Sequence, residues 1–353
     1  MNVYEFNKFF QCDRANAREI RVGASMLQCL IVQPIHQIGH DLLRQAGIMP
    51  RLARSCDMTD VAGEIEDAAA VATRNAGLST AAIMAARTLR VIAVQGIGVD
   101  PVDVTTATRR GIPVINTPYA NVQSVAEHSV ALLMALTKAI PAADRAARMQ
   151  DATFRYRAAL VELEGKTFGV VGFGRTGQAT ARLARRLGMH VIAYSPNRPH
   201  DVFENVGAVR ASLDELVSSS DFISIHLPAT VDTERLIGKE QIGRMKPGAY
   251  LINTGRASTI DEDALIEGLS SGLIGGAGLD VYSDAVIRED HPLMRLKNVI
   301  LTPHIAGSTA EAMERAARTL ANGIIAVLND RKPDHLVNPQ AWSDRWWAQA
   351  KQT

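Results

Sequence analysis

The chain has 353 residues and a formal net charge of +1, from 38 lysines and arginines against 37 aspartates and glutamates. This length suits two domains, and 47% hydrophobic with 21% charged residues is enough for ordinary globular cores. The balanced charge gives no argument for a nucleic acid or a membrane surface as partner. Cys12, Cys29 and Cys56 show no paired spacing, and the N-terminus lacks the apolar run of a signal peptide. Together these features predict a cytoplasmic protein without disulfide bonds.

The first third of the chain changes character near residue 26. Residues 1–25 show no clear periodicity and form either an extension outside the folded core or a helix packed on the surface. Strand and helix signals then alternate, which is the pattern of an α/β domain with a parallel sheet. The strands expected here are Leu27–Val32, Ala69–Thr73, Val91–Val94 and Val114–Asn116. The apolar helix expected at Val125–Ile140 contains Glu127, His128 and Lys138, so it is predicted to be buried rather than to span a membrane.

A glycine-rich segment follows in the middle of the chain. A predicted strand at Phe168–Val171 leads into Gly172–Gly177, which has the spacing G-x-G-x-x-G. A helix over Gln178–Leu187 and a strand over His190–Tyr194 come next. In this strand–turn–helix–strand context the spacing indicates dinucleotide binding. The first glycine permits a tight turn, the second lets the backbone approach a pyrophosphate, and the third lets the helix lie close to the sheet. The helix N-terminus then offers N–H groups to the phosphates.

A second alternating series continues beyond this segment. Its expected strands are Phe222–His226, Ala249–Asn253, Gly276–Asp280 and Val299–Leu301. The dinucleotide-binding domain therefore lies in the middle of the chain, with substantial material on both sides.

Ordered motifs along the chain resemble those of the D-isomer-specific 2-hydroxyacid dehydrogenases, from about Leu27 to Pro339. Besides the glycine-rich segment, they are Gly96–Asp100, Asn116–Pro118, Val125–Glu127, His226–Pro228, Met245–Gly248, Asn253–Arg256, Asp261–Leu265, Gly278–Val281 and Thr302–Ile305. The resemblance implies two Rossmann-like, doubly wound parallel-sheet domains. A cofactor domain at residues 121–306 is inserted into a split substrate domain formed by residues 26–120 and 307–353. It also implies hinges near Asn121 and Gly307, an active site in the cleft, and a homodimer assembled through the cofactor domain.

Two residues suit the chemistry of an oxidoreductase that moves a hydride between NAD(P)H and a 2-oxo or D-2-hydroxy acid. Arg256 follows a strand end, and its planar fork can hold a carboxylate and the C2 oxygen together. His304 follows the last strand, where a neutral imidazole can exchange the proton of that oxygen. A surface arginine and a structural histidine are the alternatives. The resemblance assigns both residues to catalysis.

The remaining candidate residues surround these two. Gly96, Ile97 and Gly98 form a loop whose N–H groups can bind an anion, and Arg74 and Asn75 form a further wall of the substrate pocket. The alternative for all five is an ordinary turn or surface position. The predicted cofactor contacts are Gly172, Gly174, Arg175, Thr176, Ser195, Asn197, Arg198, His226, Leu227, Pro228, Thr254, Asp280 and His304. In the family, the counterpart of Asp280 orients the nicotinamide carboxamide. No cluster has metal-ligand spacing, so no metal is expected.

Several further side chains have two possible roles. Gln95, Tyr119, Trp342, Trp346 and Trp347 either shape the substrate pocket or pack against the protein, and packing is the commoner role of such tryptophans.

Ala285 departs from the family pattern. The resemblance implies a glutamate partner of the catalytic histidine at this position. Asp284 or Glu289 could substitute for it, and the alternative is that both are solvent-facing loop charges. A nearby carboxylate would raise the pKa of His304 and hold its ring in one tautomer. We therefore expect weak or acid-shifted reduction activity, or a substrate that supplies the missing group. The pH–rate profile of Ala285→Glu tests this expectation.

A second departure concerns the choice of cofactor. NAD-preferring folds place an acidic residue after the second strand to bind the ribose 2′-hydroxyl. Here Ser195, Asn197 and Arg198 occupy this turn, which removes a repulsive charge and adds donors for a 2′-phosphate. NADP(H) is therefore expected to be preferred or at least accepted. The alternative is that Arg198 only faces solvent.

Two other functions remain open at this point. One is a catalytically weak or silent NAD(P)-sensing binding protein of the same fold, which the change at Ala285 favours and the presence of Arg256 and His304 opposes. The other is a formate- or phosphite-type dehydrogenase. NADPH oxidation with a panel of 2-oxo acids, and turnover of formate and phosphite, separate these alternatives.

Overall fold

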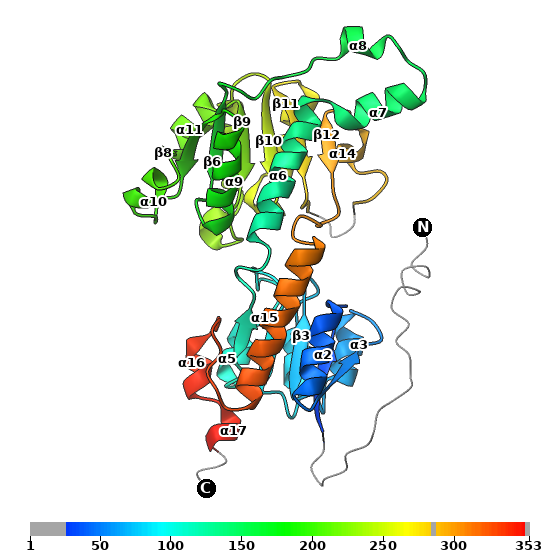
Figure 1. Ribbon diagram of the computed structural model, residues 1–353, viewed down its shortest axis with the longest axis vertical. Helices are drawn as coiled ribbons and strands as arrows, with labels where there is room; N and C mark the ends of the chain where they lie inside the picture. Colours follow the sequence, from blue (N-terminus) through cyan, green and yellow to red (C-terminus); the bar gives the residue numbers. More distant parts are fainter. Residues whose placement is uncertain (1–25, 284–286, 350–353) are drawn as a thin grey trace.

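The computed structural model describes residues 26–283 and 287–349. They form two α/β domains, each built around one sheet with all strands parallel (Figure 1). We call them the five-stranded and the seven-stranded domain. The predicted N-terminal extension, residues 1–25, lies outside the described residues.

The five-stranded sheet has the order β2-β1-β3-β4-β5. Its strands are β1 (Leu27–Ile31), β2 (Ile48–Leu52), β3 (Ala70–Thr73), β4 (Val91–Val94) and β5 (Val114–Asn116). Every residue of β3 and β4 is buried, which explains their continuous apolar runs. β2 was not predicted from the sequence because Pro50 and Arg51 interrupt its apolar pattern. Both residues are tolerated there because β2 is an edge strand.

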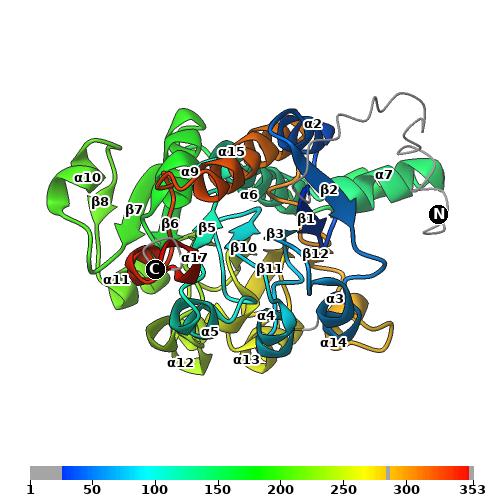
Figure 2. The ribbon, with the colours of Figure 1, turned by 90° about the horizontal axis from the view of Figure 1, so that it is seen from below.

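Helices from both ends of the chain cover this sheet. They are α2 (Gln37–Gln45), α3 (Met58–Glu64), α4 (Thr80–Ala85), α5 (Val104–Arg109), α15 (Ala310–Leu328), α16 (Pro339–Ser343) and α17 (Trp346–Gln349). Figures 1 and 2 show α15 beside α2, where a β-carbon at Gly39 would lie 3.3 Å from the Cβ of Ala317. Small residues therefore let the two helices approach closely. Trp347 is buried in the core of this domain, and its indole donates to Asp330 at 2.8 Å, so it packs rather than lines a substrate pocket.

The seven-stranded sheet has the order β12-β11-β10-β9-β6-β7-β8, which is the doubly wound arrangement. Its strands are β6 (Thr167–Val171), β7 (His190–Tyr194), β8 (Val209–Arg210), β9 (Phe222–Ile225), β10 (Ala249–Asn253), β11 (Ile274–Leu279) and β12 (Val299–Leu301). The strand order reverses between β6 and β9, and the glycine-rich segment follows β6. β8 was not predicted, because two residues are too few to show a period.

Helices cover both faces of this sheet. In chain order, the helices of the domain are α6 (Val122–Thr137), α7 (Ile140–Arg148), α8 (Phe154–Arg157), α9 (Arg175–Arg186), α10 (His200–Glu204), α11 (Leu213–Ser219), α12 (Lys239–Gly243), α13 (Glu262–Ser270) and α14 (Pro292–Arg295), with 3-10 helices η2 (Val231–Thr233) and η3 (Ala257–Thr259). Of these, α7 and α8 do not cover the sheet but project away from it (Figure 1). One apolar core includes residues of α11, α12 and α13, and another includes residues of α6, α9 and α10. α9 begins three residues before the predicted start because Gly174 takes the N-cap position.

The chain passes between the domains at two points that touch each other. A β-carbon at Gly307 would lie 2.6 Å from Asn121 Nδ2, so the two crossings are in contact. The Ser124 hydroxyl donates to the Ala306 carbonyl at 2.6 Å across the same contact. Arg315, on α15, donates through Nε to the Ala120 carbonyl at 3.0 Å. These contacts fix where the two sheets meet.

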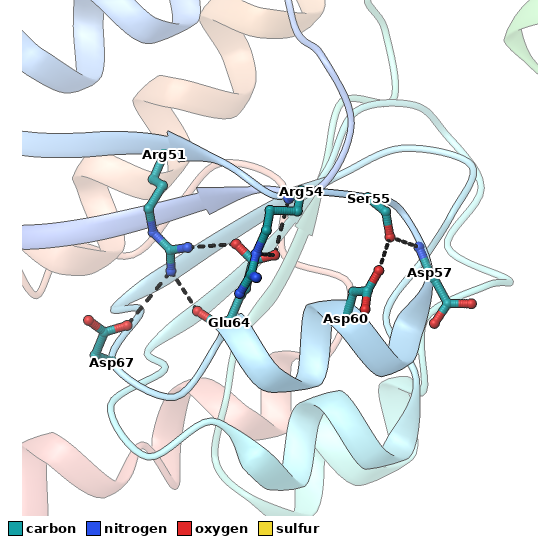
Figure 3. A network of polar contacts seen from close by, with 7 residues as sticks. All are labelled: Arg51, Arg54, Ser55, Asp57, Asp60, Glu64 and Asp67. Carbon is teal, nitrogen blue, oxygen red and sulfur yellow. Dashed lines mark hydrogen bonds and ion pairs between the residues drawn. The ribbon is translucent and has the colours of Figure 1, made fainter.

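An ion-pair network ties the edge strand β2 to helix α3 (Figure 3). The buried carboxylate of Glu64 accepts from Arg51 Nη1 at 2.8 Å and from the backbone N–H of Arg54 at 3.1 Å. The Arg54 backbone hydrogen bond is the main cause that lowers the pKa of Glu64. Arg51 also pairs with Asp67 at 3.8 Å and donates to the Glu64 carbonyl at 2.6 Å. The charges compensate one another, so this network supports the fold.

Candidate active site

The loops that leave the carboxyl ends of the strands carry most of the predicted site residues. Because each sheet is wholly parallel, these ends lie together along one edge of each sheet. The loops after β3 and β4 supply Arg74, Asn75, Gly96, Ile97 and Gly98. In the seven-stranded domain, the glycine turn follows β6, Ser195 to Arg198 follow β7, and His226 to Pro228 follow β9. Thr254 and Arg256 follow β10, Asp280 follows β11, and His304 follows β12.

Arg256 reaches across from the seven-stranded domain to the five-stranded domain. Its Nε donates to Asp100 Oδ2 at 2.9 Å, and the two side chains are 31% and 36% exposed. A β-carbon at Gly98 would overlap Arg256 Nη2, so the guanidinium lies directly against the backbone of this loop. The glycine loop and the arginine, 158 positions apart in the sequence, therefore lie against each other where the two domains meet.

The loop that presents Arg256 is fixed by a buried asparagine. Asn253, the last residue of β10, accepts from the Gly255 N–H at 2.9 Å and donates to the Arg256 carbonyl at 3.0 Å. Thr259 donates to the same carbonyl at 2.6 Å. These bonds hold the backbone on both sides of the guanidinium and limit its freedom before any ligand binds.

The loop that presents His304 is fixed by a buried aspartate. Asp280 Oδ1 accepts from the Thr302 hydroxyl at 2.6 Å and from the Ile305 N–H at 2.9 Å, and Oδ2 accepts from the Ala306 N–H at 2.8 Å. The His304 N–H donates to the Asp280 carbonyl at 3.0 Å. His304 has a φ of 54°, in the left-handed region that non-glycine residues seldom adopt. The bonds to Asp280 hold this backbone in place.

Three cationic or titratable groups converge at the junction of the domains. Although His304 reaches solvent, the protein around it removes part of its hydration, and this desolvation lowers its pKa. Asp280 acts in the opposite direction, and the positive charges of Arg256 and Arg74 lower the pKa of His304 further. The imidazole is therefore biased toward its neutral form beside two guanidinium groups.

Residues at the end of β5 hold the loop that follows β4. The Thr117 hydroxyl accepts from the Gly96 N–H at 2.9 Å, and Asn116 Nδ2 donates to the Ile97 carbonyl at 2.8 Å. Arg74, at the end of β3, donates to the Pro34 carbonyl at 3.3 Å, and its burial lowers its pKa. It lies where the order of the five-stranded sheet reverses, which is the usual ligand position in such sheets.

The glycine turn has room for a pyrophosphate. Gly172 has a φ of 94°, and a β-carbon there would lie 2.7 Å from the His226 carbonyl oxygen. A β-carbon at Gly174 would meet nothing within 4 Å, so the open side of the turn faces space. α9 has no side-chain N-cap and no acidic residue in its first turn. Its first N–H groups and its positive dipole end are therefore available to an anion.

The turn after β7 is cationic. The Arg198 N–H donates to the Ser195 carbonyl at 3.3 Å, and Asn197 and Arg198 are exposed. Arg210, on the neighbouring strand β8, donates through Nη2 to the Pro196 carbonyl at 3.0 Å. A second guanidinium thus lies beside the turn, on a strand that the sequence prediction did not contain.

The comparisons with known proteins agree with this arrangement. The D-isomer specific 2-hydroxyacid dehydrogenase NAD binding domain model matches residues 130–306. The chain is 36% identical over 300 residues to D-3-phosphoglycerate dehydrogenase of Archaeoglobus fulgidus, covering 85% of this chain and 57% of that protein. It is 40% identical over 256 residues to glyoxylate reductase of Thermococcus litoralis, covering 71% of this chain and 77% of that protein. This chain belongs to the D-isomer specific 2-hydroxyacid dehydrogenase family.

A solved structure of a family member shares the fold. The crystal structure of D-lactate dehydrogenase from Aquifex aeolicus, complexed with NAD and lactic acid, matches with a TM-score of 0.80 and 28% identity. The match covers 88% of this chain and 99% of that one. The chain spans a little over half the length of the D-3-phosphoglycerate dehydrogenases that it resembles, such as the 57% for A. fulgidus.

Sequence reasoning missed three residues of this family site. Asp100 pairs with Arg256, although its motif had been recognised. Asn253 and His128 hold the loops from behind: His128 Nε2 lies 3.0 Å from Thr302 Oγ1 and 3.6 Å from Asp280 Oδ1. Asn253 lay inside a recognised motif and His128 directly follows one, but only the contacts reveal what they hold. The carboxylate of Asp280 binds the His304 loop, and its expected contact with the cofactor stays a prediction.

The other predicted cofactor residues have mixed surroundings. His226 bonds through Nε2 to the Ser224 hydroxyl at 2.9 Å, and burial lowers its pKa to about 4, so it stays neutral. The Thr254 hydroxyl is 2.8 Å from that of Ser129 on α6. Ala285, the position of the missing family glutamate, lies outside the described residues.

Residues 26–283 and 287–349 contain neither a metal-binding cluster nor a membrane-spanning helix. No group of three or more His, Cys, Asp and Glu side chains there is arranged to hold a metal. Among the same residues, no helix has the length and apolarity needed to cross a membrane.

Proposed function

We propose that the protein reduces a small 2-oxo acid to a D-2-hydroxy acid with a nicotinamide cofactor, and catalyses the reverse oxidation. The observation that carries this proposal is that Arg256 lies against Gly98 of the glycine loop, while the charges of Arg256 and Arg74 both act on His304. The family and its glyoxylate reductase and D-lactate dehydrogenase members support the reaction class.

Arg256 and the glycine loop bind the substrate. The guanidinium holds the carboxylate and the C2 oxygen in its fork and stabilises the charge that develops on that oxygen. Arg74 adds a second positive charge at the reversal of the five-stranded sheet. Asp100 keeps the Arg256 fork turned toward the loop through its bond to Nε.

His304 exchanges the proton of the C2 oxygen. In reduction the imidazolium donates this proton, and in oxidation the neutral ring accepts it. When bound, the nicotinamide supplies or accepts the hydride at C2. Asp280 holds the His304 backbone, and its charge partly offsets the two arginines that favour the neutral ring.

The cofactor fits the seven-stranded domain. Gly172, Gly174, Arg175 and Thr176 would hold the pyrophosphate, because they offer N–H groups and an open surface at the glycine turn. The turn containing Ser195, Asn197 and Arg198 takes the adenosine ribose. Leu227, Pro228 and Thr254 lie after β9 and β10, on the path toward the nicotinamide.

We further propose that NADP(H) is preferred. No carboxylate occupies the turn after β7, and Arg198 with Arg210 brings two guanidinium groups to it. Dissociation constants of NADH and NADPH, measured by fluorescence titration, test this preference. A markedly tighter complex with NADH contradicts it.

We also propose a role for each domain and a homodimeric assembly. Residues 26–120 and 307–353 form the substrate domain, and residues 121–306 form the cofactor domain. Figure 1 shows α7 and α8 projecting away from the seven-stranded sheet. Met149 and Leu160 on this arm are 74% and 57% exposed, which suits a homodimer through the cofactor domain. Light scattering measures this oligomeric state.

The proposed location of the protein is the cytoplasm. The exposed thiol of Cys56 suits this reducing compartment.

One assay decides the main proposal. NADPH and NADH oxidation is followed with glyoxylate, hydroxypyruvate and phenylpyruvate, and the chirality of the product is determined. Turnover to a D-2-hydroxy acid supports the proposal. Tight cofactor binding without turnover of any 2-oxo acid indicates a binding protein, and NAD(P)⁺ reduction by formate or phosphite indicates a different donor.

A further inference from the structure

Tyr119 contacts two side chains from distant parts of the chain. It lies between β5 and α6, where the chain leaves the five-stranded domain, and is 49% exposed. The guanidinium carbon of Arg175 lies 3.9 Å from its ring centroid, over the ring face. The His335 ring meets it edge-on, with centroids 5.0 Å apart and an interplanar angle of 87°. The tyrosine thus joins both domains and the C-terminal segment.

The five-stranded domain fixes the position of His335. The segment after α15 runs beside β5, where the Val337 N–H donates to the Val114 carbonyl at 2.8 Å. Asn338 Oδ1 accepts from the Val114 N–H at 2.7 Å. The edge of the Tyr119 ring therefore rests on a segment that is hydrogen-bonded into the sheet.

Arg175 comes from the other domain and is the first residue of α9, directly after Gly174. Among the described residues, its guanidinium has no ion-pair or hydrogen-bond partner. Stacking uses only the face of a guanidinium, while its N–H groups point outward in the plane and remain available. An arginine stacked in this way can still bond a phosphate through its edge.

We propose that Tyr119 is a positioning residue for the pyrophosphate of the dinucleotide, acting through Arg175. The ring holds the guanidinium beside the open glycine turn before the cofactor arrives, and it does so from the opposite domain. This inference rests on the proposed binding of a nicotinamide dinucleotide. It adds that cofactor affinity depends on a side chain of the substrate domain. A stack of this kind contributes about two- to fivefold in affinity.

The test is a double-mutant cycle on cofactor binding. Dissociation constants of NADH, NADPH and ADP-ribose are measured for the unaltered protein, Tyr119→Leu, Tyr119→Phe, Arg175→Gln and the Leu/Gln double variant. We expect Tyr119→Leu to weaken all three ligands about two- to fivefold and Tyr119→Phe to leave them unchanged, because the ring is kept. The double variant should bind no more weakly than Arg175→Gln alone. Adenosine, which lacks the pyrophosphate, should bind Tyr119→Leu and the unaltered protein equally.

Arg182→Gln is the matched control. It removes the same charge from an exposed position farther along α9 and should change each affinity less than Arg175→Gln does. Thermal unfolding of each variant shows that it is folded. Additive losses in the double variant, or an unchanged affinity in Tyr119→Leu, overturn the inference while leaving the proposed function intact. Absence of NADH and NADPH binding by the unaltered protein overturns both.

Discussion

The two domains hold their site loops in different ways. In the seven-stranded domain, buried side chains at the ends of adjacent strands, Asn253 and Asp280, bind the backbones that carry Arg256 and His304. In the five-stranded domain, Asn116 at the end of β5 and the following Thr117 hold the glycine loop from its side; Thr117 is buried, whereas Asn116 is partly exposed. Loss of a buried partner leaves unpaired groups without water, whereas water can replace a partly exposed one. The loops proposed to act on the substrate thus have buried partners alone, whereas the glycine loop proposed to receive it also depends on a partly exposed one.

The largest effect is expected where both domains meet, at Arg256. Arg256→Gln should lower kcat/KM for 2-oxo acid reduction by roughly 10²–10³-fold, because the charge that stabilises the C2 oxygen is lost. Steady-state kinetics measure this loss, and the NADPH dissociation constant should stay close to that of the unaltered protein. The control is Arg235→Gln, a 70% exposed arginine 3.9 Å from Asp261. Equal kinetics for the two variants contradict the role of Arg256.

Loss of Asp280 and loss of Asn253, the two buried residues that hold the site loops, should lower the free energy of unfolding by different amounts. Asp280→Ala removes the acceptors of the Ile305 and Ala306 N–H groups and of the Thr302 hydroxyl. Asn253→Ala leaves the Gly255 N–H unpaired, while Thr259 still binds the Arg256 carbonyl. At about 1–3 kcal/mol for each buried donor left unpaired, Asp280→Ala should lower the free energy of unfolding more. Denaturant unfolding of both variants measures this order, and the reverse order contradicts it.

Sequence patterns predicted those elements of the fold that are determined by residues close together in the sequence. The buried strands and the glycine turn were recognised because each has a local signature of apolar runs or glycine spacing. The pairings of Asp100 with Arg256 and of Asp280 with residues 302–306 join segments far apart in the sequence. Such contacts have no local pattern. The edge strands β2 and β8 were missed because one contains a proline and an arginine and the other has two residues.

The surroundings of His304 predict the pH dependence of both reaction directions. Desolvation and the two arginines lower its pKa, so the imidazolium is present only below the ordinary histidine value of about 6.5. Reduction needs this proton, so kcat/KM for reduction should fall as pH rises through a midpoint below that value. Oxidation needs the neutral ring and should instead be lost as pH falls through the same region.

The same pH profiles test the opposing action of Asp280. Asp280→Asn removes the charge that raises the pKa of His304, so both midpoints should move to lower pH. Rates of both reactions across pH 4–9, roughly two units either side of the ordinary histidine value, measure the shift. Midpoints above 6.5 in the unaltered protein, or a rise in Asp280→Asn, contradict the electrostatic account.

The smallest effect is expected at the lateral support of the glycine loop. Asn116→Ala removes one hydrogen bond to the Ile97 carbonyl, which is worth about 0.5–1.5 kcal/mol. Water can reach this carbonyl, and Arg256 and His304 stay in place. The KM for the 2-oxo acid should therefore rise about two- to tenfold, with kcat nearly unchanged. Asn329→Ala is the matched control, since Asn329 donates to the Ile325 carbonyl at 2.9 Å at the far end of α15. A fall in the free energy of unfolding as large as that of Asp280→Ala would mean that the five-stranded domain holds its loop as tightly as the seven-stranded domain does.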